Sequence, residues 1–457
     1  MKTVFKQLRF PSAGVAQNLS FADATIPDEN RAFSSPHALN VRGEDVCTGR
    51  FRGGSRPGLK RLEGTVETVN GGKWLWPNGE AMAWPDGSPI AYTTVAQELV
   101  APDGSLIIDP HEPFSVRCSK GAVPPAPSLA AMYRSRLFFA SGADWFCSRI
   151  GEHGDFDYGG DSEDTARALA GNCALAGRKG ETITAFMPAN DRYMLVATRR
   201  SLWLFSADPA DGIALVSDSA GCVSANAWCA TPAGVVFVSY NGIYLFNGEG
   251  AKCVSGKLPA ALSEIDEALL GYDPEADAVH IFAEKHGAAH DWYFEMANNA
   301  FWPVKIPAQM RPVSVCRIID GGVDRTVLCG DDGVWRMFHK EQHDDDGTAM
   351  KSHVVIGPFR VSARDDLDGM VGEIHANLGG CGGNVTMEVY CADSAEEAVN
   401  GASFGGKAKH SKALAPGRNM VFRPRARGAW ACLKISSNSH WAYEGVLATL
   451  KLLGRLR

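Results

Sequence analysis

Two neighbouring stretches of the chain repeat one pattern of hydrophobic and polar positions. In residues 193–205 two apolar runs flank the polar pair 199–200, and residues 234–246 repeat this arrangement. Trp203 of the first stretch corresponds to Tyr244 of the second, 41 residues later. Short apolar runs joined by a polar turn predict β-hairpins. A period of about 40 to 50 residues with several strands per repeat is typical of a β-propeller blade.

Related hairpin patterns recur between residues 63 and 347 and predict an all-β fold with a roughly six-bladed β-propeller. The expected blades lie in residues 63–125, from residue 128 onward, in the two repeats of 181–254, in 278–303 and in 326–338. An aromatic residue recurs in the outgoing strands at spacings of 58, 41, 48 and 43, at Trp145, Trp203, Tyr244, Trp292 and Trp335. We expect these rings to pack between blades, since each blade buries its faces only against its neighbours.

The pattern differs on both sides of the propeller. Residues 1–62 predict an extended N-terminal arm that packs across the propeller or a neighbouring subunit; a basic arm that contacts DNA is the alternative. Within it, residues 56–59 predict an extended entry followed by a tight turn at Gly58. Residues 348–457 predict a C-terminal β-sandwich-like domain, or strands that partly return to close the propeller. A short helix is expected near Glu396 and Glu397.

Composition agrees with a turn-rich β protein and narrows the function. The 457 residues include 49 glycines and 24 prolines, and the net charge of −7 disfavours a protein that grips phosphate backbones. Residues 423–427 are the best candidate for a local basic patch. No secretory or membrane-spanning segment is expected, which predicts folding in the cytoplasm of the producing cell. The twelve scattered cysteines, Cys47 and Cys381 among them, are expected to be mostly buried apolar fillers rather than disulfides.

Candidate catalytic and metal-binding motifs are weak. Ser403 matches the GxSxG pattern of a nucleophile elbow, but its flanks predict a flexible glycine loop. The glycine-rich residues 379–383 predict a turn and not a phosphate cradle. Two histidine pairs have zinc-like spacing, but both lie in predicted solvated loops: His286 with His290, and His339 with His343 beside the acidic residues 344–346.

The acidic residues do not form a recognisable site either. Residues 155–164 are rich in oxygen ligands but lack EF-hand spacing, and a solvated surface loop is expected. A propeller hydrolase would need carboxylates that converge in the central channel. Its candidates lie near predicted blade loops, at Asp144, Asp155, Asp331 and Asp332. We therefore expect no enzyme activity, catalytic residue, cofactor site or metal site.

Several motifs together resemble the propeller-bearing tail and connector proteins of tailed bacteriophages, including the tail nozzle proteins of short-tailed phages. The resembling segments are residues 53–59, 133–142, 148–157, 197–205, 241–248 and 454–457. The resemblance covers residues 40–345 well and implies a virion structural protein of the tail, assembled in the bacterial host cytoplasm. It implies a homo-oligomeric ring that contacts other tail or connector proteins and through which genomic DNA passes. The nozzle proteins are considerably longer than this chain.

Two other functions remain open at this point. One is a propeller glycan hydrolase, for example a tail-associated depolymerase. The other is a cytoplasmic propeller that acts as a protein-interaction module. A stable ring favours the tail component, whereas a stable monomer favours the alternatives.

Overall fold

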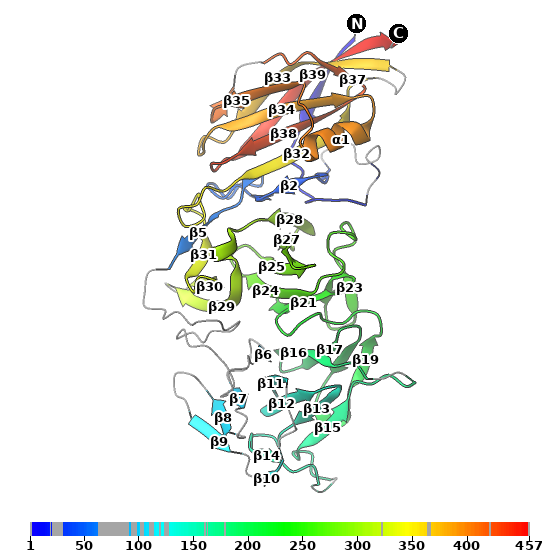
Figure 1. Cartoon of the computed structure of the whole chain (residues 1–457), viewed down its shortest axis with the longest axis vertical. Coiled ribbons are helices and arrows are strands. Elements are labelled where there is room, and N and C mark those ends of the chain that lie inside the picture. Colours follow the sequence, from blue (N-terminus) through cyan, green and yellow to red (C-terminus); the bar gives the residue numbers. More distant parts are fainter. Residues whose placement is uncertain are drawn as a thin grey trace.

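The computed structural model is an elongated molecule built almost entirely of β-strands (Figure 1). It describes residues 2–18, 20, 31–62, 91–92, 98–100, 105–108, 114–117, 120–122, 128–159, 161, 163–177, 180–320, 323–362, 367–419 and 422–455. The predicted all-β class is confirmed. Within these ranges, no helix is both long enough and apolar enough to cross a membrane.

Six successive sheets have the arrangement of propeller blades. The strands that open them, β7, β11, β16, β20, β24 and β29, follow one another as spatial neighbours. Antiparallel sheets whose first strands ring a common axis are characteristic of a propeller. The first sheet contains β7 (Glu98–Val100), β8 (Ser105–Ile108) and β9 (Phe114–Arg117). The second contains β6 (Ala91–Tyr92), β11 (Leu129–Tyr133), β12 (Arg136–Ser141), β13 (Asp144–Cys147) and β15 (Leu169–Asn172). The third contains β16 (Ile183–Asn190), β17 (Tyr193–Thr198), β18 (Leu202–Phe205) and β19 (Ala214–Ser217).

The other three sheets continue the ring in chain order. The fourth contains β20 (Trp228–Thr231), β21 (Gly234–Ser239), β22 (Gly242–Phe246) and β23 (Ala251–Cys253). The fifth contains β24 (Glu267–Asp273), β25 (Ala278–Lys285), β26 (Ala288–Ala289), β27 (Asp291–Glu295) and β28 (Ala300–Val304). The sixth contains β29 (Pro312–Asp320), β30 (Val323–Gly330), β31 (Trp335–His339) and β5 (Gly58–Arg61). Four short elements lie outside the blades. They are the 3₁₀ turns η1 (Pro209–Asp211) and η2 (Ala308–Met310), and the parallel strand pair β10 (Lys120–Gly121) and β14 (Asp155–Phe156).

The hairpins that the hydrophobic pattern predicted are present at the predicted positions. Strands β17 and β18 pair antiparallel, and so do β21 and β22. The Trp145 ring, buried on β13, meets Phe205 of the next blade at a centroid distance of 4.9 Å, as expected for packing between blades. The predicted first-blade strands at 73–76 and 83–84 lie outside the described residues.

The propeller is closed by a strand from the N-terminal arm. Strand β5 pairs antiparallel with β31 of the last blade, so the closing strand precedes the propeller in the chain instead of following residue 348. The tight turn predicted at Gly58 is wrong, because Gly58 begins this strand. A Cβ on Gly58 would stand only 1.9 Å from the Asp344 carbonyl oxygen, so the close approach of the 344 loop explains the glycine.

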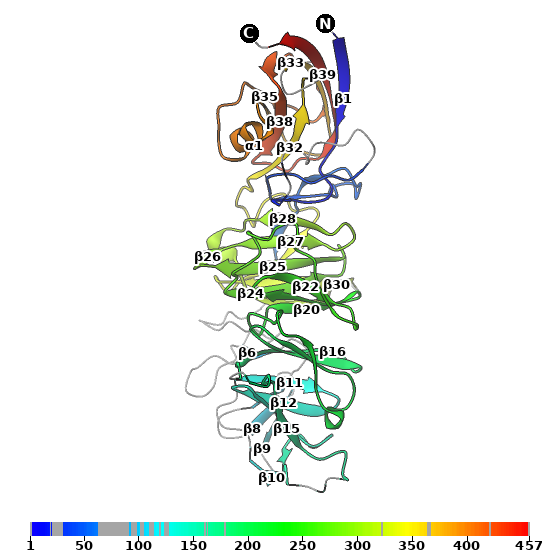
Figure 2. The same cartoon turned by 90° about the vertical axis from the view of Figure 1, so that its right-hand side faces the viewer.

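The C-terminal region forms a two-sheet sandwich, to which the arm adds two further strands. One sheet contains β1 (Lys2–Leu8), β39 (Tyr443–Arg455), β33 (Leu367–Leu378), β36 (Gly417–Arg418) and β37 (Ala426–Gly428). The other contains β2 (Ala38–Leu39), β32 (Ser352–Arg360), β38 (Trp430–Ser437), β34 (Val385–Ala392) and β35 (His410–Leu414). Figure 2 shows β1 beside β39, with both termini at the sandwich end of the molecule.

Helix α1 (Ala395–Ser403) covers one sheet of the sandwich and confirms the short helix expected near Glu396. The Ser394 side chain caps it by accepting a hydrogen bond from the Glu397 amide at 3.2 Å. Its apolar face, including Ala398 and Val399, packs on β32, β34 and β38. The helix therefore buries the outer face of a sheet whose inner face belongs to the main core.

A buried polar joint connects the propeller to the sandwich. The short pair β3 (Val41–Arg42) and β4 (Gly54–Ser55) brings Asn40 next to Arg56. Asn40 donates from Nδ2 to the Lys351 carbonyl on the sandwich side (2.8 Å), and its Oδ1 accepts the Lys305 amide on the propeller side (2.8 Å). Arg56 is fully buried and forms two hydrogen bonds to the Asp345 carboxylate, at 2.8 and 2.7 Å. The segments from both domains therefore meet at one satisfied network.

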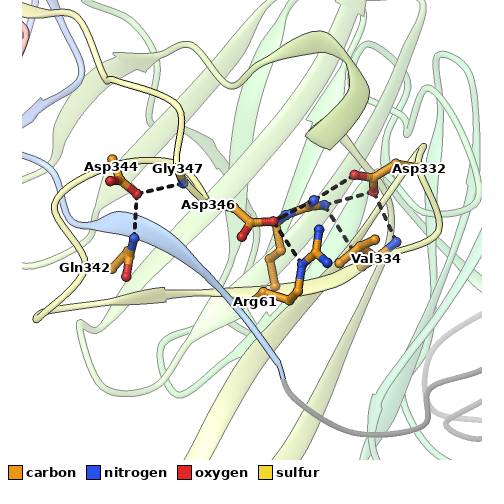
Figure 3. Close-up of polar contacts among 8 residues, drawn as sticks. Arg61, Asp332, Val334, Gln342, Asp344, Asp346 and Gly347 are labelled. Carbon is orange, nitrogen blue, oxygen red and sulfur yellow. Dashed lines mark hydrogen bonds and ion pairs between the residues drawn. The ribbon is translucent and has the colours of Figure 1, made fainter.

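The acidic loop 344–346 belongs to a second network, on the closing blade. Figure 3 shows Asp346 facing Arg61, with Asp332 nearby. Arg61 Nε donates to Asp346 Oδ2 at 3.2 Å. Arg336, nearly fully buried, bonds to both carboxylates, at 2.7 Å to Asp332 and 2.9 Å to Asp346. Buried guanidinium groups need such partners. The sequence predicted a solvated loop at residues 344–346, beside a weak candidate metal site. The loop instead holds the closing strand β5 in place through Asp346.

The side chains of ten cysteines are described, and none of these ten forms a disulfide. Most are buried, as predicted. Cys47 and Cys253 are exposed, and Cys381 is half-buried; these three are the exceptions among the ten.

Candidate functional site: the cavity on the propeller axis

A cavity of about 550 Å³ lies where the opening strands of five blades begin. Propellers commonly bind ligands where their loops surround the central axis, because many blades can contribute one side chain each. We call this space the axial cavity; its lining residues are Ser128, Leu129, Thr182, Ile183, Thr184, Ser224, Ala225, Asn226, Glu267, Ala268, Leu269, Phe282, Glu284, Arg311, Pro312 and Val313.

Apolar side chains line part of the axial cavity. Leu129, Ile183, Ala225 and Ala268 are all buried, and they come from four successive blades. The starts of three opening strands and the loop before β20 therefore supply one apolar surface. This surface is the part of the cavity that repetition of the blade pattern produces.

The charged side chains break this repetition. Glu267 on β24 and Glu284 on β25 stand directly opposite each other in the antiparallel register. Like charges at opposed positions of two strands are unfavourable unless a cation or solvent compensates them. Arg311, which precedes β29, lines the same cavity. The axial cavity therefore combines two carboxylates with one guanidinium group.

Arg311 is positioned by a buried carboxylate of the neighbouring blade. Its Nε donates to Asp291 Oδ1 at 3.2 Å, and its Nη2 donates to the Ala283 carbonyl oxygen at 2.5 Å. Burial raises the pKa of the Asp291 carboxyl to about 6, and Arg311 beside it acts in the opposite direction. The ion pair fixes the guanidinium between the fifth and sixth blades.

Small polar groups of the lining hold the blades together. Thr184 donates its hydroxyl to the Cys222 carbonyl (2.6 Å), and Ser224 donates to the Ala268 carbonyl (3.1 Å). Each bond joins one blade to the next, so the wall is rigid. A rigid cavity with carboxylates, a guanidinium group and an apolar surface is suited to binding a small zwitterionic group or a side chain of a partner protein.

The histidine pairs are not brought together as metal ligands. His286 lies in the turn between β25 and β26, 3.5 Å from Glu264, whereas the half-buried His290 ring packs against Trp292. His339 ends β31 and accepts the Glu341 amide, while His343 stacks on His440 at 4.4 Å between centroids. Neither pair lies on a helix, as expected, and of these four histidines only His339, at the end of β31, belongs to a strand.

Ser403 is not at a nucleophile elbow. It ends helix α1, whereas an elbow serine precedes its helix and follows a strand. Its hydroxyl is buried without a hydrogen-bond partner among the described residues. The flexible glycine loop expected here is wrong, because the alanine-rich, capped helix extends through Gly401.

The carboxylates considered for hydrolysis are dispersed. Asp144 and Asp155 belong to the second blade region, and Asp332 pairs with Arg336 in the last blade. Asp331 uses its amide to bond the Arg311 carbonyl at 3.1 Å. None of these four aspartates lines the axial cavity as described.

The two charged loops also have structural roles. Asp155 is buried on β14 with Lys120 3.8 Å away, and Asp164 pairs with Arg149, so the predicted solvated loop is fastened at both ends. In the basic segment 423–427, Arg423 pairs with Glu373 at 2.7 Å. This segment lies in the sandwich, on and before strand β37.

Sequence reasoning missed Glu267, Glu284 and Arg311. Only Glu284 lies within a predicted blade, and the opening strands β24 and β29, next to which Glu267 and Arg311 lie, were not predicted. Their convergence depends on how blades are arranged around the axis, which no local pattern encodes.

No protein-family model and no curated protein matches the chain. Among solved structures, the extracellular domain of the one-component system BT4673 from B. thetaiotaomicron is 10% identical, with a TM-score of 0.40. This chain covers 40% of that chain's length, and 73% of this chain is aligned. The chain is also similar to the N-terminal domain of Nup159, with 6% identity and a TM-score of 0.29 over 55% of this chain and 91% of that one. It is similar to the WD40 propeller domain of Doa1, with 10% identity and a TM-score of 0.26 over 55% of this chain and 93% of that one. Similarity at this level assigns no function.

Proposed function

We propose that this protein is a non-enzymatic structural subunit of a phage-tail type assembly, and that copies of it form a ring around a path for DNA. The observation that carries the proposal is the joint of Asn40, Arg56 and Asp345. It locks a propeller and a sandwich into one elongated body through buried, fully paired groups.

A locked two-domain body suits a subunit that holds a fixed place in a larger assembly. Interfaces between domains of one chain are commonly weak, and relative motion is the usual expectation. Here the N-terminal arm supplies β1 and β2 to the sandwich and β5 to the propeller. One covalent segment therefore crosses the joint and takes part in both domains.

The charge of the chain is compatible with a DNA path. The net charge of −7 disfavours tight contact with phosphates, and each such contact along a conduit would slow passage. Three of the segments that resemble phage tail proteins, residues 133–142, 197–205 and 241–248, lie on the blades.

The direct test is electron microscopy of the purified full-length protein at several concentrations. The proposal predicts rings with a central opening at or above the ~20 Å diameter that duplex DNA requires. Single elongated particles at every concentration would contradict it.

A second candidate is a protein-interaction module that uses the axial cavity. Glu267 and Glu284, which line the same cavity as Arg311, favour it, because mixed charges on an apolar wall select a specific polar group. For a ring-forming subunit, the variant Arg311→Ala should leave assembly unchanged. For an interaction module, the protein should stay monomeric and the same variant should abolish partner binding.

A further inference from the structure

Four potential metal ligands converge where the N-terminal arm meets the sandwich. They are Asp45, Cys47, Cys381 and His440, and their ligand atoms all lie within 4.8 Å of one another. Three separate segments of the chain supply them. None of these residues takes part in the axial cavity or in the joint of Asn40, Arg56 and Asp345.

The distances are close to those of a metal centre. Cys47 Sγ lies 3.0 Å from His440 Nε2. A tetrahedral zinc ion with bonds of about 2.0 to 2.3 Å separates its ligand atoms by roughly 3.5 to 3.8 Å. Small rotations of the thiol and imidazole groups therefore suffice to admit an ion.

The histidine is already oriented for ligation. Ser55 Oγ, which is buried, lies 2.8 Å from His440 Nδ1 and accepts the Trp441 amide at 3.1 Å. This contact leaves Nε2 as the nitrogen that faces Cys47. A metal-bound imidazole donates its other ring N–H to an acceptor that fixes the ring, and the Ser55 hydroxyl oxygen is placed to accept this proton.

The two cysteine loops are fixed by backbone hydrogen bonds. Around Cys47, the Gly49 amide donates to the Asp45 carbonyl (2.8 Å), and the Cys47 amide donates to Asp45 Oδ1 (3.0 Å). Around Cys381, the Gly383 amide donates to the His440 carbonyl (2.7 Å). The glycine-rich turn at 379–383 thus places a thiol beside the imidazole.

Charge is balanced if the thiols bind as thiolates. Asp45 Oδ2 is held by Arg52 Nη2 at 2.7 Å, while Oδ1 accepts only the Cys47 amide among the described contacts. Two thiolates, one carboxylate, a divalent ion and the Arg52 guanidinium sum to zero; Arg52 also pairs with the carboxylate of Glu444, which is exposed to solvent. Thiolate and imidazole ligands together favour zinc over magnesium or calcium.

We propose that Cys47, Cys381 and His440, completed by Asp45 Oδ1, bind a structural Zn²⁺ ion that clips the N-terminal arm to the sandwich. Cys47 is exposed, so an ion can reach the site from solvent. Binding replaces the two thiol protons, which pass to solvent, and involves no redox step. The site does not depend on the proposed tail function.

The test uses the full-length protein kept under a thiol reductant, with zinc content per chain and Co²⁺ absorption as readouts. Wild type should carry one zinc per chain and show thiolate-to-cobalt charge transfer. Cys47→Ser, a change at an exposed position, should lose both signals while circular dichroism stays unchanged. Cys253→Ser, at the other cysteine that is exposed among the ten described, should keep both.

A supporting variant separates positioning from ligation. Ser55→Ala should retain the cobalt spectrum but weaken zinc binding by about 10- to 100-fold. The proposal is overturned if wild type under reductant binds zinc no more tightly than Cys47→Ser. It is also overturned if chains alkylated during cell lysis contain a Cys47–Cys381 disulfide in place of zinc.

Discussion

Replacing Arg56 by methionine should destabilise the protein strongly, because it removes the centre of the joint. Methionine keeps an unbranched apolar stem but no charge. The five N–H donors of Arg56 all have acceptors: Asn40 Oδ1, the Pro57 and Lys305 carbonyls, and both oxygens of Asp345. Both Arg56 and Asp345 are buried, with 0% and 2% of their surface exposed.

The magnitude follows from what the substitution leaves behind. Removing one partner of a buried ion pair costs about 3 to 5 kcal/mol, since the remaining charge has lost its compensation. Replacing both partners by apolar groups costs much less. The double variant Arg56→Met with Asp345→Leu should therefore recover at least ~1 kcal/mol relative to Arg56→Met alone.

Urea unfolding followed by tryptophan fluorescence measures these differences. Arg192→Met, a change at an exposed arginine, is the matched control and should stay within about 0.5 kcal/mol of wild type. If Arg56→Met folds and loses less than ~1 kcal/mol, the joint is not what holds the two domains together.

Three further predictions concern separate parts of the fold. Burial, with His37 and Lys434 nearby, lowers the pKa of His353 to about 3, whereas the unfolded chain binds this proton below about pH 6.5. This group alone should reduce stability by about 2 kcal/mol between pH 7 and 5, and His440, whose pKa burial lowers to about 4, acts in the same direction. The unfolding free energy from urea titrations should therefore fall by about 2 kcal/mol less over this range in His353→Gln than in wild type. Gly58→Ala should loosen the closing strand β5 and speed amide hydrogen exchange in β31, because the added Cβ meets the Asp344 carbonyl. Gly250→Ala is the control, since Gly250 has open space around it, and equal exchange rates in the two variants would refute the prediction. Trp145→Ala should cost about 3 to 5 kcal/mol by the same unfolding assay, and a loss below ~1 kcal/mol would contradict packing between blades.

The sequence pattern predicted the blades better than their closure. Hairpins such as β21–β22 are encoded locally, because apolar alternation and a polar turn lie within a dozen residues. The pairing of β5 with β31 joins residues 58–61 to 336–339 and leaves no local signal. Gly58 was therefore read as a turn residue, although the neighbouring Asp344 carbonyl is what requires it.

The sites were harder to predict for the same reason. Histidines at a spacing of four suggested ligands, yet His343 stacks on His440, which has no neighbouring histidine in sequence. The convergence of Cys47 with Cys381 depends on a glycine-rich turn that is anchored to residue 440. Spacing rules find sites within one element, whereas these residues come from three.

The central claim is that a locked propeller–sandwich body is the unit of a ring. Light scattering on the purified full-length chain, over a wide dilution series, tests it most directly. A mass that is a fixed integer multiple of 49.0 kDa, unchanged on dilution until the ring dissociates in one step, is the predicted result. A mass of 49.0 kDa at every concentration would contradict the claim and favour the interaction module.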